Sequence, residues 1–315
     1  MKIITSFFRL IRWPNLLFIA LTMIMFRYCI IQPIFSAAGI TQNIHGIYFW
    51  LLVTSYVFIA AAGYIINDYF DLNIDQINKP QKVIIAKVIS RRWVLLWHGV
   101  LSLSAIILNI YIDGEAHNKH LPSVAAFACV VLLFLYSASL KKKFLIGNIL
   151  VAAITAWVMP ILTLCEANHL IFINRIPANF DNEKLVRLTF LYTGFAFIIS
   201  LIREVVKDME DMNGDIRYGC KTMPILWGIN ATKVFVAVWL IVLIAVLSAA
   251  QFYVIQFKWW LSIVYALIVI IVPLIYIFSK LFKAKTPQDF HQLSTTIKFV
   301  MFTGILSMIF FRFYP

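Results

Sequence analysis

Residues 231–254, ATKVFVAVWLIVLIAVLSAAQFYV, form an apolar run that contains one charged side chain. A helix needs about 20 such residues to cross the roughly 30 Å hydrocarbon core of a bilayer. Backbone polar groups in lipid must be paired within the segment, which favours a helix, whereas a membrane β-barrel would show alternation. The sequence predicts about nine such spans, at residues 14–35, 48–66, 93–112, 121–138, 146–165, 187–203, 231–254, 259–279 and 297–314. We therefore expect an all-α, polytopic membrane protein.

The composition of the whole chain agrees with this class. Of the 315 residues, 62% are hydrophobic and 13% are charged, against about 45–50% and about 25% in soluble domains. We expect a single transmembrane domain over residues 1–315, with no soluble domain and no cleaved signal peptide. The cysteines lie in or beside apolar runs without metal-ligand spacing, so we expect buried, unlinked side chains at Cys29, Cys129, Cys165 and Cys220.

The basic residues indicate an orientation. With the N-terminus inside, 20 of the 27 Lys and Arg residues fall on the cytoplasmic side and six on the other, while Arg27 lies within the first span. This asymmetry follows the positive-inside rule. The same distribution explains the net charge of +13 without a contiguous basic face, so we expect no nucleic-acid binding. The predicted location is the bacterial cytoplasmic membrane, with the N-terminus in the cytoplasm.

Eight of the 14 acidic residues occupy two short stretches, each of which follows a predicted span on the cytoplasmic side. The first is NDYFDLNID at residues 67–75, and the second is REVVKDMEDMNGD at residues 203–215. If the helices continue, the carboxylates of each stretch share one helical face. The two sets so defined are Asp68, Asp71 and Asp75, and Glu204, Asp208, Asp211 and Asp215.

Carboxylates gathered on one face near hydrocarbon are unfavourable unless positive charge compensates them. A divalent hard cation is the economical compensation, because Mg²⁺ takes carboxylate oxygens, retains water and bridges to phosphate. A solvated acidic loop paired with neighbouring lysines is the simpler alternative. Two sets with one-face spacing on the same side of the membrane favour metal binding.

These two stretches resemble the paired acidic motifs of the UbiA superfamily of intramembrane prenyltransferases. The first reads as N-D-x-x-D-x-x-x-D from Asn67, and the second as a D-x-x-x-D-x-x-D type motif with Glu204 in place of the usual Asp. The resemblance covers essentially the whole chain. The residue pattern of the second motif is similar to that of the branch that prenylates geranylgeranylglyceryl phosphate. The first motif departs from the family in its tail, Lys79-Pro80-x-Lys82, where repeated Arg-Pro is usual.

The resemblance implies helices arranged around a central cavity and transfer of a prenyl group from its diphosphate to a lipophilic acceptor. It also implies two Mg²⁺ ions, one for each acidic set, which would stabilise the charge of the departing diphosphate. Its implied catalytic residues are Asn67, Tyr136, Lys141 and Asp208. Its implied substrate-binding residues are Arg12, Asn15, Lys79, Asn148, Arg203, Lys207 and Lys221. An allylic cation would need a dry site with aromatic faces, for which Tyr136 is the candidate.

Several alternatives stay open from the sequence. The acceptor could instead be an aromatic ring of quinone biosynthesis, such as 4-hydroxybenzoate or dihydroxynaphthoate, or a porphyrin. An ion-coupled transporter is the rival of another class, although its charges would be expected near the bilayer midplane. The D-G-x-x-A-R signature of CDP-alcohol phosphotransferases is absent from both acidic stretches. Prenyl chain length and oligomeric state are left undetermined.

Overall fold

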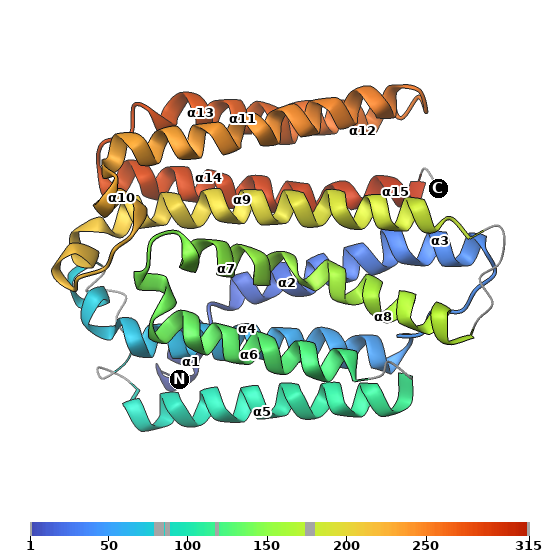
Figure 1. Cartoon of the computed structure of the whole chain (residues 1–315), viewed down its shortest axis with the longest axis horizontal. Helices are drawn as coiled ribbons and strands as arrows, with labels where there is room; N and C mark the ends of the chain where they lie inside the picture. Colours follow the sequence, from blue (N-terminus) through green and yellow to red (C-terminus); the bar gives the residue numbers. More distant parts are fainter. Residues whose placement is uncertain (1, 79–84, 86–88, 117–119, 174–179, 314–315) are drawn as a thin grey trace. The chain divides into compact units, whose positions relative to one another are not determined.

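The structure is a computed structural model that describes residues 2–78, 85, 89–116, 120–173 and 180–313, and helices dominate these residues (Figure 1). Eight of the described helices are long and apolar enough to cross a membrane. Helices α7 (Ile146–Ala156) and α8 (Val158–Ile173), interrupted at Trp157, supply a ninth if they form one span. The all-α class and the expected number of spans are confirmed.

The chain divides into two compact units, and the prediction of a single domain stays a prediction. The first unit comprises residues 1–140 and 157–190, and the second comprises residues 141–156 and 191–315. Helix α9 (Asn182–Arg217) begins in the first unit and continues into the second. The other helices of the first unit are α1 (Lys2–Leu10), α2 (Trp13–Phe26), α3 (Gln32–Ala37), α4 (Ile47–Asn78), α5 (Arg91–Ala116), α6 (Leu121–Ala138) and α8.

Helix α4 is the centre of the first unit, where it packs against α2, α5 and α6. The contact with α6 is close because Gly63 carries no side chain, and a Cβ at this position would lie 2.9 Å from a methyl carbon of Leu133. A buried ion pair joins the π segment η1 (Arg27–Ile31), which continues α2, to α8, since the Arg27 guanidinium lies 3.8 Å from the Glu166 carboxylate. The same carboxylate accepts the backbone N–H groups of Asn43 and Ile44. The loop before α4 is thereby held to α8.

The second unit contains α7, most of α9, and the helices that follow. These are α10 (Met223–Leu226), α11 (Gly228–Ile255), α12 (Trp260–Tyr265), α13 (Val272–Leu281), α14 (Pro287–Leu306) and α15 (Phe310–Phe313). Helices α11, α13 and α14 run side by side (Figure 1) and bury one apolar cluster with α9. Lys233 is buried. Its ammonium donates, at 2.6 Å, to the carbonyl of Ala284, which lies just beyond the end of α13. This contact satisfies a carbonyl near the helix end.

Two membrane helices widen into π-helix that ends two residues before a proline. The first π segment is η1 (Arg27–Ile31), which precedes Pro33, and the second is η3 (Ala266–Ile271), which precedes Pro273. A proline ring clashes with the carbonyl four residues earlier and donates no hydrogen bond. In both helices that carbonyl belongs to the π segment. The wider turn therefore relieves the clash locally while each helix continues.

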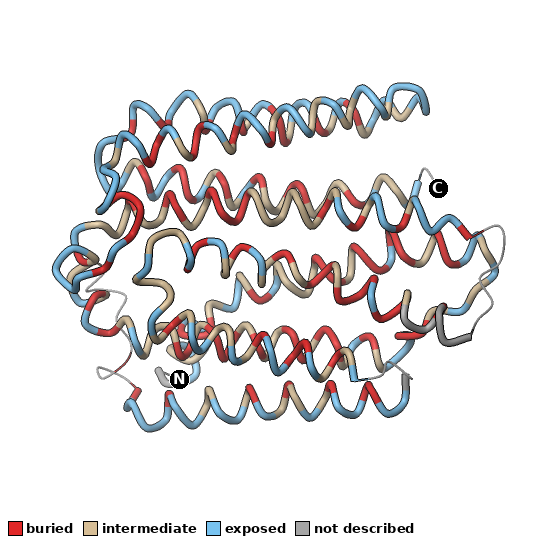
Figure 2. The backbone as a smooth tube through the Cα atoms, in the orientation of Figure 1, coloured by how far each residue is buried: buried red, intermediate tan, exposed pale blue. Residues whose placement is uncertain are grey.

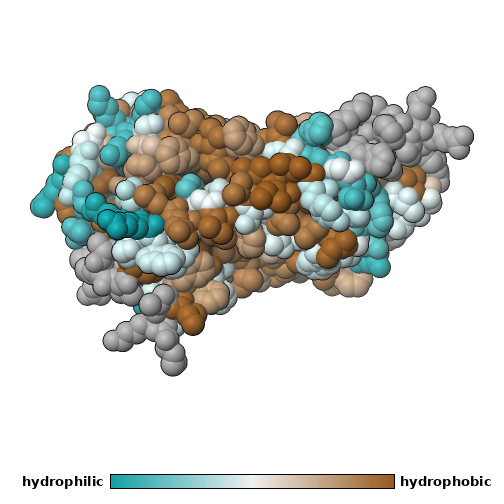
Figure 3. All heavy atoms as spheres, turned by 90° about the horizontal axis from the view of Figure 1, so that it is seen from below, coloured by the Kyte–Doolittle hydropathy of each residue, from teal (hydrophilic) through white to brown (hydrophobic). Residues whose placement is uncertain are grey.

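Burial varies along each helix in the way expected of a protein surrounded by lipid. Buried and exposed residues alternate around the helices (Figure 2). On α5 most of the exposed residues are themselves apolar, as at Leu96, Val100, Leu103 and Ile107. The face that includes α5 is apolar between hydrophilic residues near its ends (Figure 3). The predicted burial of the four cysteines is confirmed, and all four are free thiols.

Three predicted boundaries differ from the structure by ten residues or more. The spans predicted to end at residues 66 and 203 belong to helices that continue to Asn78 and Arg217. The span predicted to begin at residue 297 belongs to α14, which begins ten residues earlier. Thr286 and Asp289 form a capping box there, and Pro287 occupies the first turn. Hydropathy marks the part of a helix that lies in lipid, whereas the helix itself can continue through polar turns, and capping groups mark its ends.

Candidate active site

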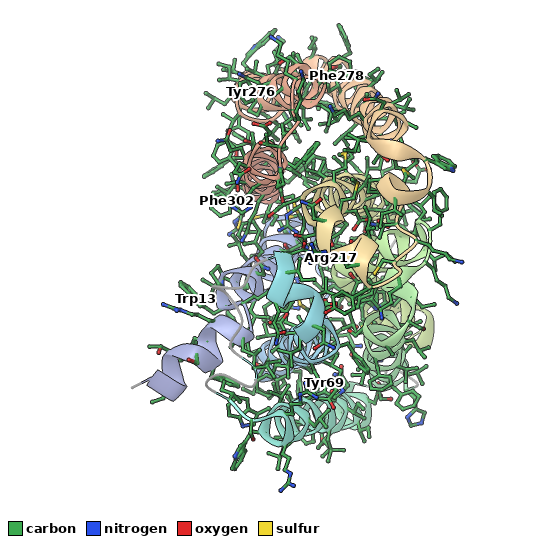
Figure 4. The ribbon with its side chains drawn as sticks, turned by 90° about the vertical axis from the view of Figure 1, so that its left-hand side faces the viewer. Trp13, Tyr69, Arg217, Tyr276, Phe278 and Phe302 are labelled. Carbon is green, nitrogen blue, oxygen red and sulfur yellow. The ribbon has the colours of Figure 1, made fainter. Side chains whose placement is uncertain are left out.

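The first acidic set lies on the last turns of α4. Because α4 is continuous to Asn78, its carboxylates at Asp68, Asp71 and Asp75 follow each other at three- and four-residue spacing along one face. All three side chains are half-buried. The Asn67 amide donates to an Oδ atom of Asp71 at 2.8 Å, which orients that carboxylate. Figure 4 views this end of the helices, with Tyr69 of α4 labelled.

Arg12 compensates part of this negative charge. Its guanidinium lies 2.6 Å from Oδ1 of Asp68 and 5.0 Å from the centroid of the Tyr64 ring. The Asp68 carboxylate raises the pKa of Arg12, so this side chain stays cationic. Arg12 has a left-handed backbone conformation, with φ 52° and ψ 51°, in the turn between α1 and α2. Non-glycine residues held in this region usually reflect a constraint from the surrounding structure; here it is the contact with α4.

The second acidic set lies on the extended end of α9. Glu204, Asp208, Asp211 and Asp215 follow the i, i+4, i+7, i+11 spacing on a continuous helix. The helix ends at Arg217, which is labelled in Figure 4. Gly219 then adopts φ +67°, and the N–H of Cys220 donates to the carbonyl of Asp215. This is the pattern of a Schellman motif, which needs a residue without a Cβ penalty at the left-handed position.

Asp208 and Glu204 contact side chains of the second unit. The Asn148 amide of α7 donates to an Oδ atom of Asp208 at 2.8 Å, and Asn148 is buried. Glu204 accepts Arg203 at 3.0 Å on one oxygen and Lys207 at 3.4 Å on the other. The protein thus neutralises Glu204 with its own cations, whereas Asp208 receives a neutral donor in these contacts. Asp208 is the better candidate for carrying a metal ion in this set.

Basic loops lie beside the end of α9. The backbone N–H of Lys221 donates to the carbonyl of Lys142 at 2.7 Å, which joins the loop after α9 to the loop before α7. Lys141 and Lys221, both predicted to bind substrate or take part in catalysis, lie on these joined loops. Lys221 is exposed and Lys141 is half-buried. Their ammonium groups are suited to phosphate oxygens.

Two of the remaining predicted residues lie on helices of the first unit. Tyr136 is half-buried near the end of α6, and Asn15 lies in the first turn of α2. Lys79 falls outside the described residues. The structure adds Tyr64, which the sequence reasoning missed. Its position four residues before Asp68 on α4 was the available signal, because residues at this spacing are neighbours on a helix.

The donor chemistry of both sets fits Mg²⁺. Among the described residues, no three or more His, Cys, Asp or Glu side chains gather closely enough to hold a metal ion. Mg²⁺ is usually bound by one or two carboxylates together with waters and substrate phosphates. The half-buried carboxylates of α4 and α9 offer such oxygens, and a carboxylate that accepts one hydrogen bond keeps further acceptor positions. Asp71 and Asp208 each accept one amide in this way.

The family model for the UbiA prenyltransferase family matches residues 24–304 of the chain. The chain belongs to the UbiA prenyltransferase family. It is therefore an integral, multi-pass membrane enzyme that transfers prenyl groups. A digeranylgeranylglyceryl phosphate synthase of Methanosphaera stadtmanae is 32% identical over 254 residues, 80% of this chain and 83% of that protein. The synthase of Saccharolobus solfataricus is 30% identical over 251 residues, 80% of each chain.

Solved structures share the UbiA fold with this chain. One comes from a study of the digeranylgeranylglyceryl phosphate synthase in membranes, with a TM-score of 0.61 and 20% identity over 98% of this chain and 99% of that chain. Another is a UbiA homologue from Archaeoglobus fulgidus bound to DMAPP and Mg²⁺, with a TM-score of 0.56 and 16% identity over 96% and 99% of the two chains. At these identities the likeness supports the fold.

Proposed function

We propose that this UbiA prenyltransferase transfers a prenyl group from a polyprenyl diphosphate to (geranylgeranyl)glyceryl phosphate. The observation that carries the proposal is the similarity to digeranylgeranylglyceryl phosphate synthases over four-fifths of the chain. The residue pattern of the second acidic motif, which resembles that of the branch that prenylates geranylgeranylglyceryl phosphate, supports the same acceptor. In the reaction, the bond from the allylic carbon to the diphosphate oxygen breaks, the acceptor hydroxyl oxygen forms the new bond, and its proton is released.

We assign the two acidic sets to diphosphate binding through Mg²⁺. Asp68, Asp71 and Asp75 would hold one ion, and Glu204, Asp208, Asp211 and Asp215 would hold a second. Bound Mg²⁺ would stabilise the negative charge that develops on the departing diphosphate. We propose two Mg²⁺ ions because the chain has two acidic sets. The homologue from Archaeoglobus fulgidus, which was solved with DMAPP and Mg²⁺, supports the use of this metal in the family.

The chain's own residues would prepare the site. Asn67 and Asn148 each donate a hydrogen bond that orients the carboxylate of Asp71 or Asp208, respectively. Arg12 holds Asp68 and limits the repulsion within the first set. We propose that Arg203 and Lys207 serve the same purpose at Glu204 and reach phosphate oxygens when substrate binds.

Five further residues keep the roles that the family resemblance implies. The cations at Lys141 and Lys221 would contact diphosphate or the acceptor phosphate, and Lys79 would do so after the first set. Tyr136 would face the allylic cation, which an aromatic ring attracts by roughly 0.5–2 kcal/mol. Asn15 would line the substrate pocket. The orientation that the basic residues favour puts both acidic sets, and therefore the reaction, on the cytoplasmic side of the membrane.

The test is a competition between acceptors. Purified protein in detergent would receive labelled prenyl diphosphates of several lengths together with geranylgeranylglyceryl phosphate, 4-hydroxybenzoate and dihydroxynaphthoate, with products identified by mass. We expect a Mg²⁺-dependent product on the glyceryl phosphate lipid. A product on an aromatic acceptor would overturn the proposed acceptor and retain the family chemistry. Uptake of an ion into proteoliposomes without any prenyl product would contradict the proposed prenyl-transfer activity and favour a transporter.

A further inference from the structure

Helices α9 and α14 lie side by side in the second unit (Figure 1) and share its apolar cluster. Two contacts between them show that they are antiparallel and fix their register. Nδ1 of His291 lies 3.0 Å from Oε1 of Glu210, and the hydroxyl group of Ser307, directly after α14, lies 3.0 Å from that of Tyr192. From the first contact to the second, the chain advances 16 residues along α14 and goes back 18 along α9. The register is therefore nearly constant over this interval.

This register places Lys298 of α14 opposite Arg203 of α9, because each lies seven residues from the contact between His291 and Glu210. The positive charges of Lys298 and Arg203 are close enough to repel each other. Both residues belong to helices that are long and apolar enough to cross the membrane. Like charges that face each other within such helices are unfavourable unless an anion compensates them.

The carboxylate next to Arg203 is already shared between two cations. Glu204 accepts Arg203 on one oxygen and Lys207 on the other, so one negative charge meets two positive charges. Lys298 brings a third cation to the same level of the two helices. The side chains of Arg203 and Lys207 are 22% and 26% exposed, and Lys298 is half-buried, so none of the three is sealed from a ligand. The arrangement favours an additional anion that contacts both helices.

We propose that Lys298 binds a phosphate group of a substrate together with Arg203. Phosphate suits this position because it offers several acceptor oxygens to more than one cation, and ionisable residues within membrane spans commonly mark substrate paths. Arg203 lies five residues before Asp208, which is about 7.5 Å farther from the end of α9 at Arg217. The assignment rests on the proposed function, in which the prenyl diphosphate and the glyceryl phosphate acceptor both carry phosphate. Separate binding measurements distinguish these two sources.

The test measures binding without turnover. Purified full-length protein in detergent would be titrated with geranylgeranyl thiodiphosphate, a poorly reactive analogue of the donor, in the presence of Mg²⁺, and separately with geranylgeranylglyceryl phosphate. Lys298→Met removes the charge and keeps an apolar stem that a membrane span tolerates. We expect it to weaken binding of one of the two ligands by about 10- to 100-fold, the effect of one hydrogen bond to a charged group. The ligand that binds more weakly identifies the phosphate, and Lys298→Arg should restore most of the affinity.

A matched control removes a lysine charge elsewhere in the same unit. Lys280→Met is suitable, because Lys280 is exposed at the end of α13, where its ammonium lies over the ring of Tyr276. It should leave both affinities unchanged. Unchanged affinity for both ligands in folded Lys298→Met protein would overturn the proposal, as would an equal loss in the control. A loss shared by both ligands that Lys298→Arg does not restore would indicate a structural role and overturn it as well.

Failure of the proposed function would look different. If the wild-type protein prenylates an aromatic acceptor and does not bind geranylgeranylglyceryl phosphate, the proposed acceptor is wrong. The titration with the thiodiphosphate then still decides the role of Lys298, because every prenyl transfer from a diphosphate needs that substrate. In that case, unchanged thiodiphosphate affinity in Lys298→Met would overturn the proposal, and a loss that Lys298→Arg restores would support it.

Discussion

Asn148 offers a sharp test of the second acidic set, because its amide is held to Asp208 by one hydrogen bond. Asn148→Ala removes a 2.8 Å contact in a site where Asn148 is 8% exposed. A hydrogen bond to a charged group is worth about 1.5–3 kcal/mol, which corresponds to about 10- to 150-fold in an equilibrium. Replacing a residue that orients a metal ligand typically lowers metal affinity or activity by 10- to 100-fold. We expect a loss in that range.

The assay is prenyl transfer at increasing Mg²⁺ concentration. In Asn148→Ala the Mg²⁺ concentration for half-maximal rate should rise by about 10- to 100-fold, and saturating Mg²⁺ should restore most of the rate. Asn109→Ala is the matched control, because Asn109 is fully buried and its amide donates to a backbone carbonyl, that of Ala105, at 2.8 Å. The reasoning is refuted if Asn148→Ala keeps the wild-type Mg²⁺ dependence, or if the control shows the same shift.

Two further predictions concern stability. Glu166→Ala should lower the free energy of unfolding by about 3–5 kcal/mol, because it leaves the buried Arg27 guanidinium without its carboxylate; thermal unfolding in detergent would measure it. Gly304→Ala should lower stability by about 1–3 kcal/mol, because its new Cβ would lie 2.4 Å from a ring carbon of Phe195; the same unfolding measurement applies.

Matched substitutions control these two predictions. Glu183→Ala removes an exposed carboxylate that pairs with Arg187 at the surface, where such pairs contribute little, so its effect should stay below about 1 kcal/mol. Gly194→Ala introduces a Cβ with no neighbour within 4 Å and should be nearly neutral or slightly stabilising in its helix. If either control destabilises as strongly as its partner, the structural explanation for that pair is wrong.

Hydropathy was sufficient to predict the membrane helices, because crossing lipid requires long apolar segments with internally paired backbones. It did not predict how far α4 and α9 extend, since their acidic ends are polar and still helical. Nor did it predict the interruption at Trp157, although Pro160 follows three residues later and its ring would clash with the carbonyl of Ala156, where α7 ends. The π segments could have been anticipated from Pro33 and Pro273, because a proline within a span disturbs the turn before it.

The candidate site was likewise predicted only in part from the sequence. The i, i+3 and i+4 spacing identified which carboxylates share a face, because that information is local to each helix. The partners of those carboxylates required tertiary packing. Arg12 lies 56 positions from Asp68, and Asn148 lies 60 positions from Asp208. The family resemblance named all four residues, and the structure adds which atoms of each pair meet.

The most direct test of the central claim is the Mg²⁺-dependent turnover of Asp71→Ala and Asp208→Ala, one variant for each acidic set. The assay would use purified, folded protein with a prenyl diphosphate and geranylgeranylglyceryl phosphate. If both sets bind Mg²⁺ for diphosphate departure, each variant should lose most of its turnover while folding normally. Full Mg²⁺-dependent turnover in both variants would contradict the assignment of the two acidic sets to Mg²⁺ binding.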